Sequence, residues 1–126
     1  MKKVILTADA PAPIGPYSQA IQQGPFLFCS GQIPIDPKSG NVVLGPIEDQ
    51  AELVLKNIQA LLKAAGYSFV DVMKSTIFLT NMGDFAKVNE VYGKYFTEQP
   101  AARSTIQVAA LPKGVNVEIE VVAYRN

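Results

Sequence analysis

The residues best suited to chemistry in this sequence lie near its C-terminus, in two segments that alternate between polar and apolar side chains. The polar positions are Arg103, Thr105 and Gln107, then Asn116, Glu118 and Glu120; the apolar faces are Ser104, Ile106 and Val108, then Val117, Ile119 and Val121. A period of two is typical of β-strands, so we expect each apolar face in the core and a guanidinium or carboxylates on the other face. Such a pair suggests a site for a small anionic molecule.

The residue types that are absent remove most other catalytic chemistries. There is no histidine, which excludes Ser-His-Asp triads, HExxH zinc sites and histidine proton shuttles. The single cysteine, Cys29, lies in the apolar run FLFCSG, which favours a packing role over a nucleophilic one. No glycine-rich nucleotide motif is present. We therefore expect carboxylate, arginine, hydroxyl and backbone-amide chemistry, with no metal and no cofactor.

Composition predicts an ordinary globular protein, a single domain over residues 1–126. Eleven basic and eleven acidic residues cancel and are scattered, which argues against an electrostatic grip on nucleic acid. No apolar run approaches the ~18 residues of a membrane helix. The N-terminal apolar run is only three residues long, so a signal peptide is not expected and the predicted location is cytoplasmic.

The elements that must position these residues follow from periodicity and turn residues. A proline-rich arm at 11–16 precedes expected strands at 18–22 and 26–33. A 3.6-residue apolar stripe predicts a helix from Ile47 to the stop at Gly66, then a strand at 72–80 and a second helix at 84–97. The order β-β-β-α-β-α-β-β predicts an α+β fold, one sheet with two helices on one face. Its other face would then need a partner, which predicts a homo-oligomer.

Each candidate site residue also has a plain structural interpretation. Arg103 is either a surface ion-pair partner or a bidentate clamp on a carboxylate. Glu118 and Glu120 belong either to a solvated sheet face or, if that face is an interface, to a site where a carboxylate accepts a proton from water. Asn89 suits a helix cap or a subunit contact at least as well as a ligand contact. Tyr92, with Tyr95 and Phe96, is interpreted as helical core.

Two further candidates lie in the N-terminal third. Tyr17, after Gly15-Pro16, is either an aromatic plug for the arm or part of a site. Ser30-Gly31 is either a simple strand end or a place where a ligand approaches the backbone closely, which glycine permits.

Several motifs together resemble the RidA family, also called the YjgF/YER057c/UK114 family. They occur in the family's order along nearly the whole chain: IGPYSQA (14–20), SGQIP (30–34), NEVYGKYF (89–96), ARST (102–105), ALPKG (110–114) and VEIEVVA (117–123). The resemblance implies a chorismate-mutase-like fold and a homotrimer with sites in clefts between subunits. It also implies that the last strand lies centrally in a mixed sheet, whereas local pattern alone predicts a hairpin of the last two strands.

The activity implied by the resemblance is hydrolysis of 2-imino or enamine acids, such as 2-iminobutanoate and 2-iminopropanoate, to 2-keto acids and ammonia. By position, Arg103 would bind the substrate carboxylate and Glu118 would position or activate water. Gly31 and Thr105 would hold the polar end of the substrate, and the cleft would be lined by Tyr17, Ser30 and Asn89. Some members carry cysteine where this chain has Thr105, so a thiol-dependent mechanism is excluded here.

Two alternatives remain open on the sequence. One is a non-catalytic trimer that binds small carboxylates as a sensor or regulatory partner. The other is the ribonuclease or translation-inhibitor role attributed to some relatives, which the zero net charge does not favour.

Overall fold

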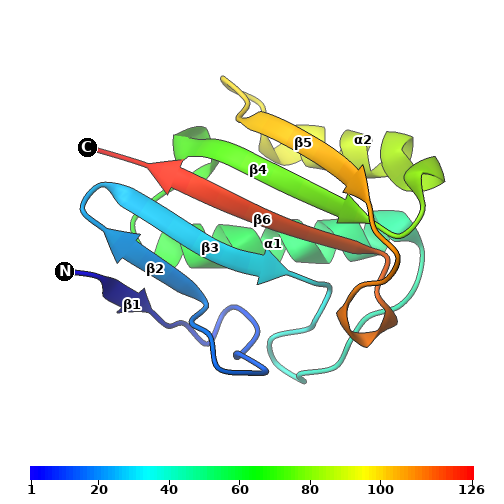
Figure 1. The fold of residues 1–126 in the computed structure, drawn as a ribbon, viewed down its shortest axis with the longest axis horizontal. Helices are drawn as coiled ribbons and strands as arrows, with labels where there is room; N and C mark the ends of the chain where they lie inside the picture. Colours follow the sequence, from blue (N-terminus) through cyan, green and yellow to red (C-terminus); the bar gives the residue numbers. More distant parts are fainter.

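A six-stranded mixed sheet with two helices on one of its faces forms the molecule, as Figure 1 shows. The computed structural model describes all residues 1–126. The strands are β1 (Lys3–Ile5), β2 (Ala20–Gln23), β3 (Phe26–Gln32), β4 (Val72–Leu79), β5 (Ala102–Gln107) and β6 (Val117–Tyr124), and the helices are α1 (Ile47–Ala64) and α2 (Phe85–Tyr95). The predicted α+β class and element order are confirmed, and β1 lies outside the residue ranges expected for strands.

The last strand of the chain lies in the middle of the sheet. The strand order is β1-β2-β3-β6-β4-β5, in which β4 and β5 are parallel and all other neighbours are antiparallel. A hairpin of β5 and β6, expected from local pattern alone, is therefore wrong. The apolar face of β6, from Val117 through Ile119 and Val121 to Ala123, is fully buried, so β6 occupies the centre of the sheet while β5 takes an edge.

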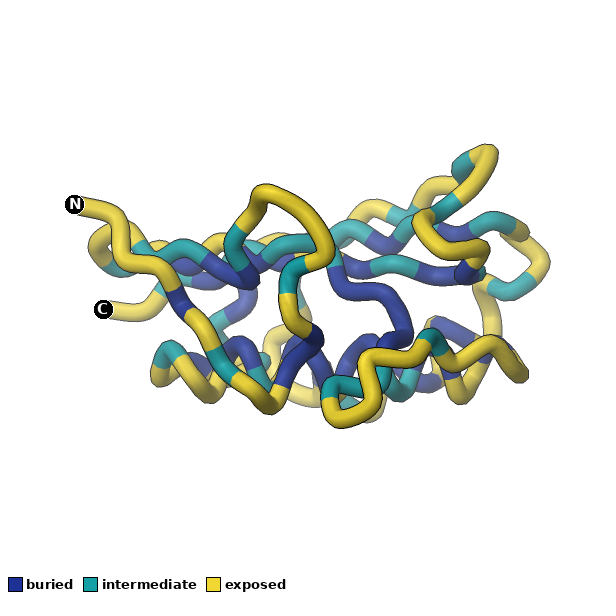
Figure 2. The backbone as a smooth tube through the Cα atoms, turned by 90° about the horizontal axis from the view of Figure 1, so that it is seen from below, coloured by how far each residue is buried: buried dark blue, intermediate teal, exposed yellow.

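The ends of helix α1 are set by residues that favour helix starts and stops. Pro46 precedes it, Glu48 and Asp49 in its first turn complement the helix dipole, and Gly66 just beyond it has a φ of 84°, in the left-handed region. Its apolar stripe is buried against the sheet. Figure 2 shows the buried segments gathered between the sheet layer and the helix layer.

Helix α2 is shorter than the predicted 84–97 because Phe96 leaves helical geometry at φ −104° and ψ 67°. Val88, Val91 and Tyr92 face the core, and the Tyr92 ring stacks on Phe96 at a centroid distance of 4.1 Å. The prediction that these rings belong to the core is confirmed for Tyr92 and Phe96 and holds only in part for Tyr95, which is half-buried.

One prediction about strand faces is wrong. In β5 the side that carries Arg103 and Thr105 is turned toward the helix layer and half-buried, whereas Ser104 and Ile106 lie exposed on the other side of the sheet. The parallel register with β4 decides this, because it pairs Arg103 with Ser75, whose side chain is buried under α2. In β6 the apolar residues face the core as predicted.

The sheet face without helices, called here the open face, exposes large apolar side chains. Phe26, Phe28 and Ile106 are 43%, 47% and 44% exposed, and Phe26 packs edge-on against Tyr124 at 5.0 Å. Such a surface is more apolar than a monomer needs. No helix in the structure has both the length and the apolar character needed to cross a membrane.

Candidate functional site

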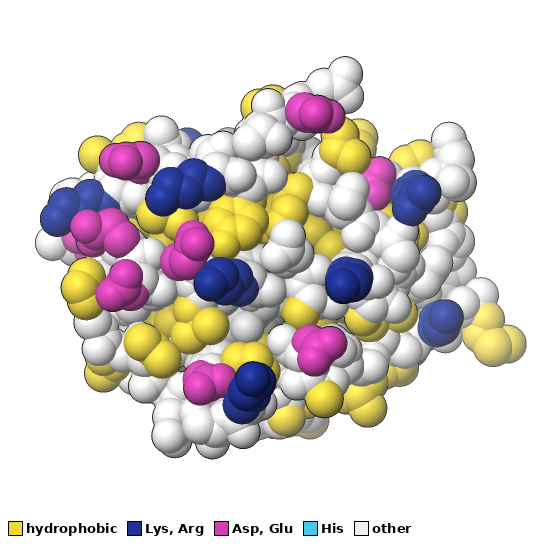
Figure 3. Space-filling model, turned by 180° about the vertical axis from the view of Figure 1, so that it is seen from behind, with side chains coloured by type: hydrophobic (Ala, Val, Ile, Leu, Met, Phe, Trp, Pro, Cys, Tyr) yellow, Lys and Arg dark blue, Asp and Glu magenta, His cyan; other side chains and the backbone are white.

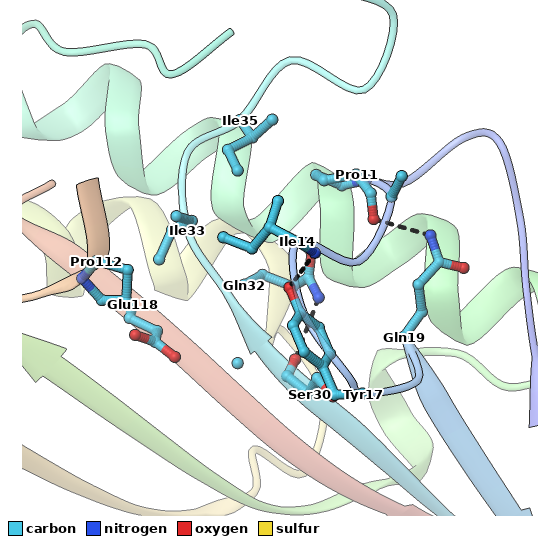
Figure 4. Close-up of a pocket in the computed structure, with 12 residues that line it drawn as sticks. Pro11, Ile14, Tyr17, Gln19, Ser30, Gln32, Ile33, Ile35, Pro112 and Glu118 are labelled. Atoms are coloured by element: carbon cyan, nitrogen blue, oxygen red, sulfur yellow. Dashed lines mark hydrogen bonds between the residues drawn. The ribbon is translucent and has the colours of Figure 1, made fainter. Parts of the chain in front are cut away.

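A pocket of about 290 Å³ opens at one end of the open face, where the N-terminal arm crosses the end of β3. Figure 4 shows Glu118 and Pro112 on one side of it, Tyr17 and Ser30 opposite, and isoleucines above. The lining residues are Pro11, Ala12, Ile14, Tyr17, Gln19, Ser30, Gly31, Gln32, Ile33, Ile35, Pro112 and Glu118. Four of the sequence-predicted site residues, Glu118, Gly31, Tyr17 and Ser30, therefore come together here.

A β-bulge aims Gly31 at Glu118. Between the pairs Cys29–Val121 and Gln32–Ile119, two residues of β3 stand opposite one of β6. The extra residue turns Gly31 to the open face, where the Glu118 carboxylate packs against its α-carbon. A β-carbon on Gly31 would lie 2.9 Å from Cδ and 3.2 Å from Cγ of Glu118, so glycine is what admits the carboxylate.

The Glu118 carboxyl group binds its proton more tightly than an ordinary glutamate. Burial raises its pKa above the usual 4.5, and the neighbouring charge of Glu120 raises it further. Glu120 is exposed two residues along the same face of β6. A half-buried carboxylate with raised proton affinity suits the acceptance and return of a proton.

The arm that closes the pocket is tied to the sheet by one buried side chain. Gln19 accepts from the Thr7 amide at 2.8 Å and donates to the carbonyls of Thr7, Ala10 and Pro11 at 2.9–3.2 Å. Within the arm, the Tyr17 hydroxyl accepts from the Ile14 amide at 3.1 Å. These bonds hold the pocket wall without any regular secondary structure.

The Ser30 hydroxyl is hydrogen-bonded to the backbone of the N-terminal arm. It donates to the Ser18 carbonyl at 2.6 Å, so its oxygen fixes β3 to the arm. Ser30 lines the pocket, yet its proton is committed to this bond.

Arg103 lies in a second group of polar and aromatic residues, beside α2. Its guanidinium carbon is 4.8 Å from the centroid of the Tyr92 ring and 5.6 Å from that of Phe85. The Thr105 hydroxyl oxygen, on the same side of β5, is buried without a hydrogen-bond partner. Asn89 is exposed on α2, four residues after Phe85 and thus on the same helix face.

Arg103 and Glu118 point to opposite faces of the sheet. Arg103 pairs with Ser75 of β4 on the helix side, and Glu118 pairs with Phe78 of β4, three residues further on and therefore on the other side. One chain thus places these residues in two separate groups: the pocket with Glu118, and the α2 side with Arg103, Thr105 and Asn89.

Sequence reasoning missed Phe85 and the second role of Tyr92. Tyr92 was assigned to the core, which is correct, but its ring also supports Arg103. The signal was present in the spacing, because Phe85 and Tyr92 are seven residues apart and so share one helix face. Pro112, in a turn at Pro112–Gly114, was also missed as a pocket residue.

The helix side of the molecule shows no block of charge of one sign. Figure 3 shows basic and acidic side chains interspersed over the helices, with apolar surface between them. A wider hollow of about 760 Å³ also lies on this side, along α1 and the arm.

The fold and its pockets define a small α+β protein with a half-buried carboxylate in an interstrand pocket. A family model described as Endoribonuclease L-PSP matches residues 7–125. A RutC family protein of Pyrococcus horikoshii is 59% identical over 99% of both chains. The 2-iminobutanoate/2-iminopropanoate deaminase of Mus musculus is 50% identical over 98% of this chain and 91% of its own.

A solved structure of Escherichia coli TdcF with bound serine superposes with a TM-score of 0.94 at 45% identity, covering 98% of this chain and 99% of that one. The chain belongs to the RidA (YjgF/YER057c/UK114) family and has its chorismate-mutase-like fold, as the motifs predicted. Its relatives include reactive intermediate deaminases.

Proposed function

We propose that this protein is a 2-iminobutanoate/2-iminopropanoate deaminase, which hydrolyses reactive 2-imino acids to 2-keto acids and ammonia. The observation that carries the proposal is the half-buried Glu118 carboxylate packed over Gly31 in a pocket of about 290 Å³. A mouse relative of that name, 50% identical over nearly the whole chain, supports the choice of substrate.

The proposed site combines two half-sites, the pocket with Glu118 and the group with Arg103, which come from two copies of the chain. Arg103 and Glu118 lie on opposite sheet faces, so they cannot hold one small acid within a single protomer. If copies pack through the exposed apolar residues of the open face, Glu118 of one protomer can meet Arg103 of the next. This is the homotrimer with interfacial sites that the family resemblance implies, and burial of Phe26, Phe28 and Ile106 would favour it.

In this site Arg103 binds the carboxylate of the imino acid. A guanidinium presents two parallel N–H donors that match a carboxylate, and no carboxylate of the same chain pairs with Arg103. The Thr105 hydroxyl, buried without a partner, and the exposed amide of Asn89 are available beside it.

Glu118 manages the proton of the attacking water. Water adds its oxygen to C2 of the protonated C=N group while Glu118 accepts a proton from that water, giving a neutral carbinolamine. Glu118 returns this proton to the nitrogen. The carbinolamine hydroxyl then gives its own proton to Glu118 as the carbonyl re-forms and the C–N bond breaks, and the nitrogen leaves as ammonia. The raised pKa of Glu118 suits both transfers, because the carboxyl group holds a proton more readily than an ordinary glutamate and can then release it.

The reaction makes modest demands on the protein. Imines hydrolyse readily in water, so orientation of substrate and water together with neutralisation of one carboxylate accounts for the needed acceleration.

A trapping assay tests the proposal. An L-amino-acid oxidase generates 2-imino acids in the presence of semicarbazide, and an active deaminase lowers the yield of semicarbazone from the imine. We expect the wild-type protein to lower it and Arg103→Ala and Glu118→Gln to lose most of this effect. Arg125→Ala is the matched control, since Arg125 is exposed and its guanidinium bonds the Gly66 carbonyl, away from both half-sites.

The same samples separate the alternatives. A sensor would bind 2-ketobutyrate through Arg103 without lowering semicarbazone formation. A ribonuclease would cleave RNA with steep salt dependence, and the cleavage would disappear in Arg103→Ala. Either result in place of imine hydrolysis overturns the proposed function.

A further inference from the structure

Arg103 is held by aromatic rings in place of an acidic partner. Its guanidinium carbon lies 4.8 Å from the Tyr92 ring centroid and 5.6 Å from the Phe85 centroid, both within cation–π range. The strand places Arg103 half-buried at the sheet edge, beneath the first turns of α2. A long flexible side chain in such a place would sample many rotamers unless something held it.

The Tyr92 ring is itself fixed from two sides. Its hydroxyl and the Ser75 hydroxyl are 2.6 Å apart, and its ring stacks on Phe96 at 4.1 Å with an interplanar angle of 10°. Tyr92 is 5% exposed. The Tyr92 ring is therefore a rigid surface against which the Arg103 guanidinium packs.

Phe85 contacts the Arg103 guanidinium as the second aromatic ring and contributes little to the core. It is 37% exposed at the start of α2, seven residues before Tyr92, so the two rings project from one side of the helix toward β5. A phenylalanine that contributes so little to the core, and that contacts the one unpaired guanidinium near the half-site, indicates a positioning role.

We propose that Phe85 and Tyr92 form an aromatic clamp that pre-organises Arg103 to bind the substrate carboxylate. The inference rests on the proposed function, which assigns the carboxylate to Arg103. Rings hold a guanidinium by its face and leave its N–H edge free, whereas an acidic partner would occupy that edge. The clamp thus lowers the conformational entropy lost on binding without competing with the ligand.

Phe85 allows a test that leaves the core intact. Phe85→Leu keeps an apolar side chain but removes the ring, and Phe85→Tyr keeps the ring. Met82→Ala is the control, because Met82 is an exposed apolar side chain three residues earlier, 38% exposed, outside the clamp. For each variant, the dissociation constant of pyruvate, kcat and KM for the imine, and the chemical shift of the Arg103 Nε–H are measured.

We expect Phe85→Leu to weaken pyruvate binding and raise KM by roughly three- to fivefold, with kcat nearly unchanged. In Phe85→Leu the Arg103 Nε–H resonance should lose its ring-current shift. Phe85→Tyr should keep the wild-type pyruvate affinity, KM and Nε–H shift, and Met82→Ala should change none of them. Unchanged binding and KM in Phe85→Leu, or a loss that Phe85→Tyr does not restore, overturns the clamp. Failure of the wild-type protein to bind pyruvate or hydrolyse the imine overturns the proposed function instead.

Discussion

The carboxylate of Glu118 lies directly over the α-carbon of Gly31, in the space that the β-carbon of any larger residue would occupy. A bulge in β3 creates this contact by turning Gly31 to the open face. The backbone of Gly31 is not in the left-handed region, so its need for glycine comes from the carboxylate and not from the chain.

Gly31→Ala should therefore separate activity from stability. The new methyl group displaces the mobile end of the Glu118 side chain, so we expect kcat/KM to fall about ten- to a hundredfold while the free energy of unfolding changes by less than about 1 kcal/mol. The imine-trapping assay measures kcat/KM, and urea unfolding measures the free energy of unfolding. Gly93→Ala is the control, since a β-carbon there meets no atom within 4 Å. Full activity in Gly31→Ala would contradict the role of this contact.

The charge of Glu120 should be measurable at Glu118. Burial is the first cause of the raised pKa of Glu118 and Glu120 is the second, so Glu120→Gln should lower the Glu118 titration midpoint without returning it fully to 4.5. Titration of ¹³C-labelled glutamate by NMR gives the midpoint. Glu90→Gln, on the exposed side of α2, is the control. A midpoint that stays fixed or rises in Glu120→Gln would show that the two charges are not coupled in this way.

The raised pKa of Glu118 also predicts the sign of a pH effect on stability. The folded protein binds the Glu118 proton more tightly than the unfolded chain does, so this group stabilises the fold below about pH 4.5. Its contribution is lost as the pH rises through the raised pKa. Glu118→Gln removes the effect, so the variant should gain stability relative to wild type as the pH rises from about 4.5 through the raised pKa. Urea unfolding at several pH values and one protein concentration measures the difference; a constant difference would refute the assignment.

Gln19 should control the order of the arm. Gln19→Leu leaves one amide and three carbonyls of residues 7–11 without their buried partner, which we expect to cost about 3 kcal/mol of unfolding free energy. Amide exchange at Thr7 should accelerate more than exchange in α1. Gln59→Leu, on the exposed face of α1, should change neither value. Unaltered protection of the Thr7 amide would mean that the arm is held by other contacts.

Cys29 should be chemically silent in the folded protein. Burial raises the pKa of its thiol to about 12, so almost no thiolate is present at neutral pH. We expect iodoacetamide to modify Cys29 at least roughly a hundredfold more slowly in the folded state than in urea. Mass spectrometry over time measures both rates. Comparable rates in the two states would disprove the packing role.

Much of the fold could be predicted from the sequence because the sequence patterns that specify it involve residues close together in the chain. The 3.6-residue stripe from Ile47, the dipole-matched first turn and the stop at Gly66 are contacts among near neighbours, and each was predicted. The alternation in β6 likewise predicted which of its sides is buried. The chemical candidates also followed from residue type, since few groups remain once histidine and reactive cysteine are removed.

The sequence by itself determined which side chains exist to do chemistry and which elements carry them. Only the tertiary structure decided how they face, because faces depend on pairing between distant strands. The central place of β6 came from the family resemblance and not from local pattern, and the parallel register of β5 on β4 turned Arg103 toward α2, against the expected burial of Ile106. A bulge of one residue brought Gly31 under Glu118. Strand alternation has a period of two, so a change of one residue in register reverses every face, and no short stretch of sequence specifies it.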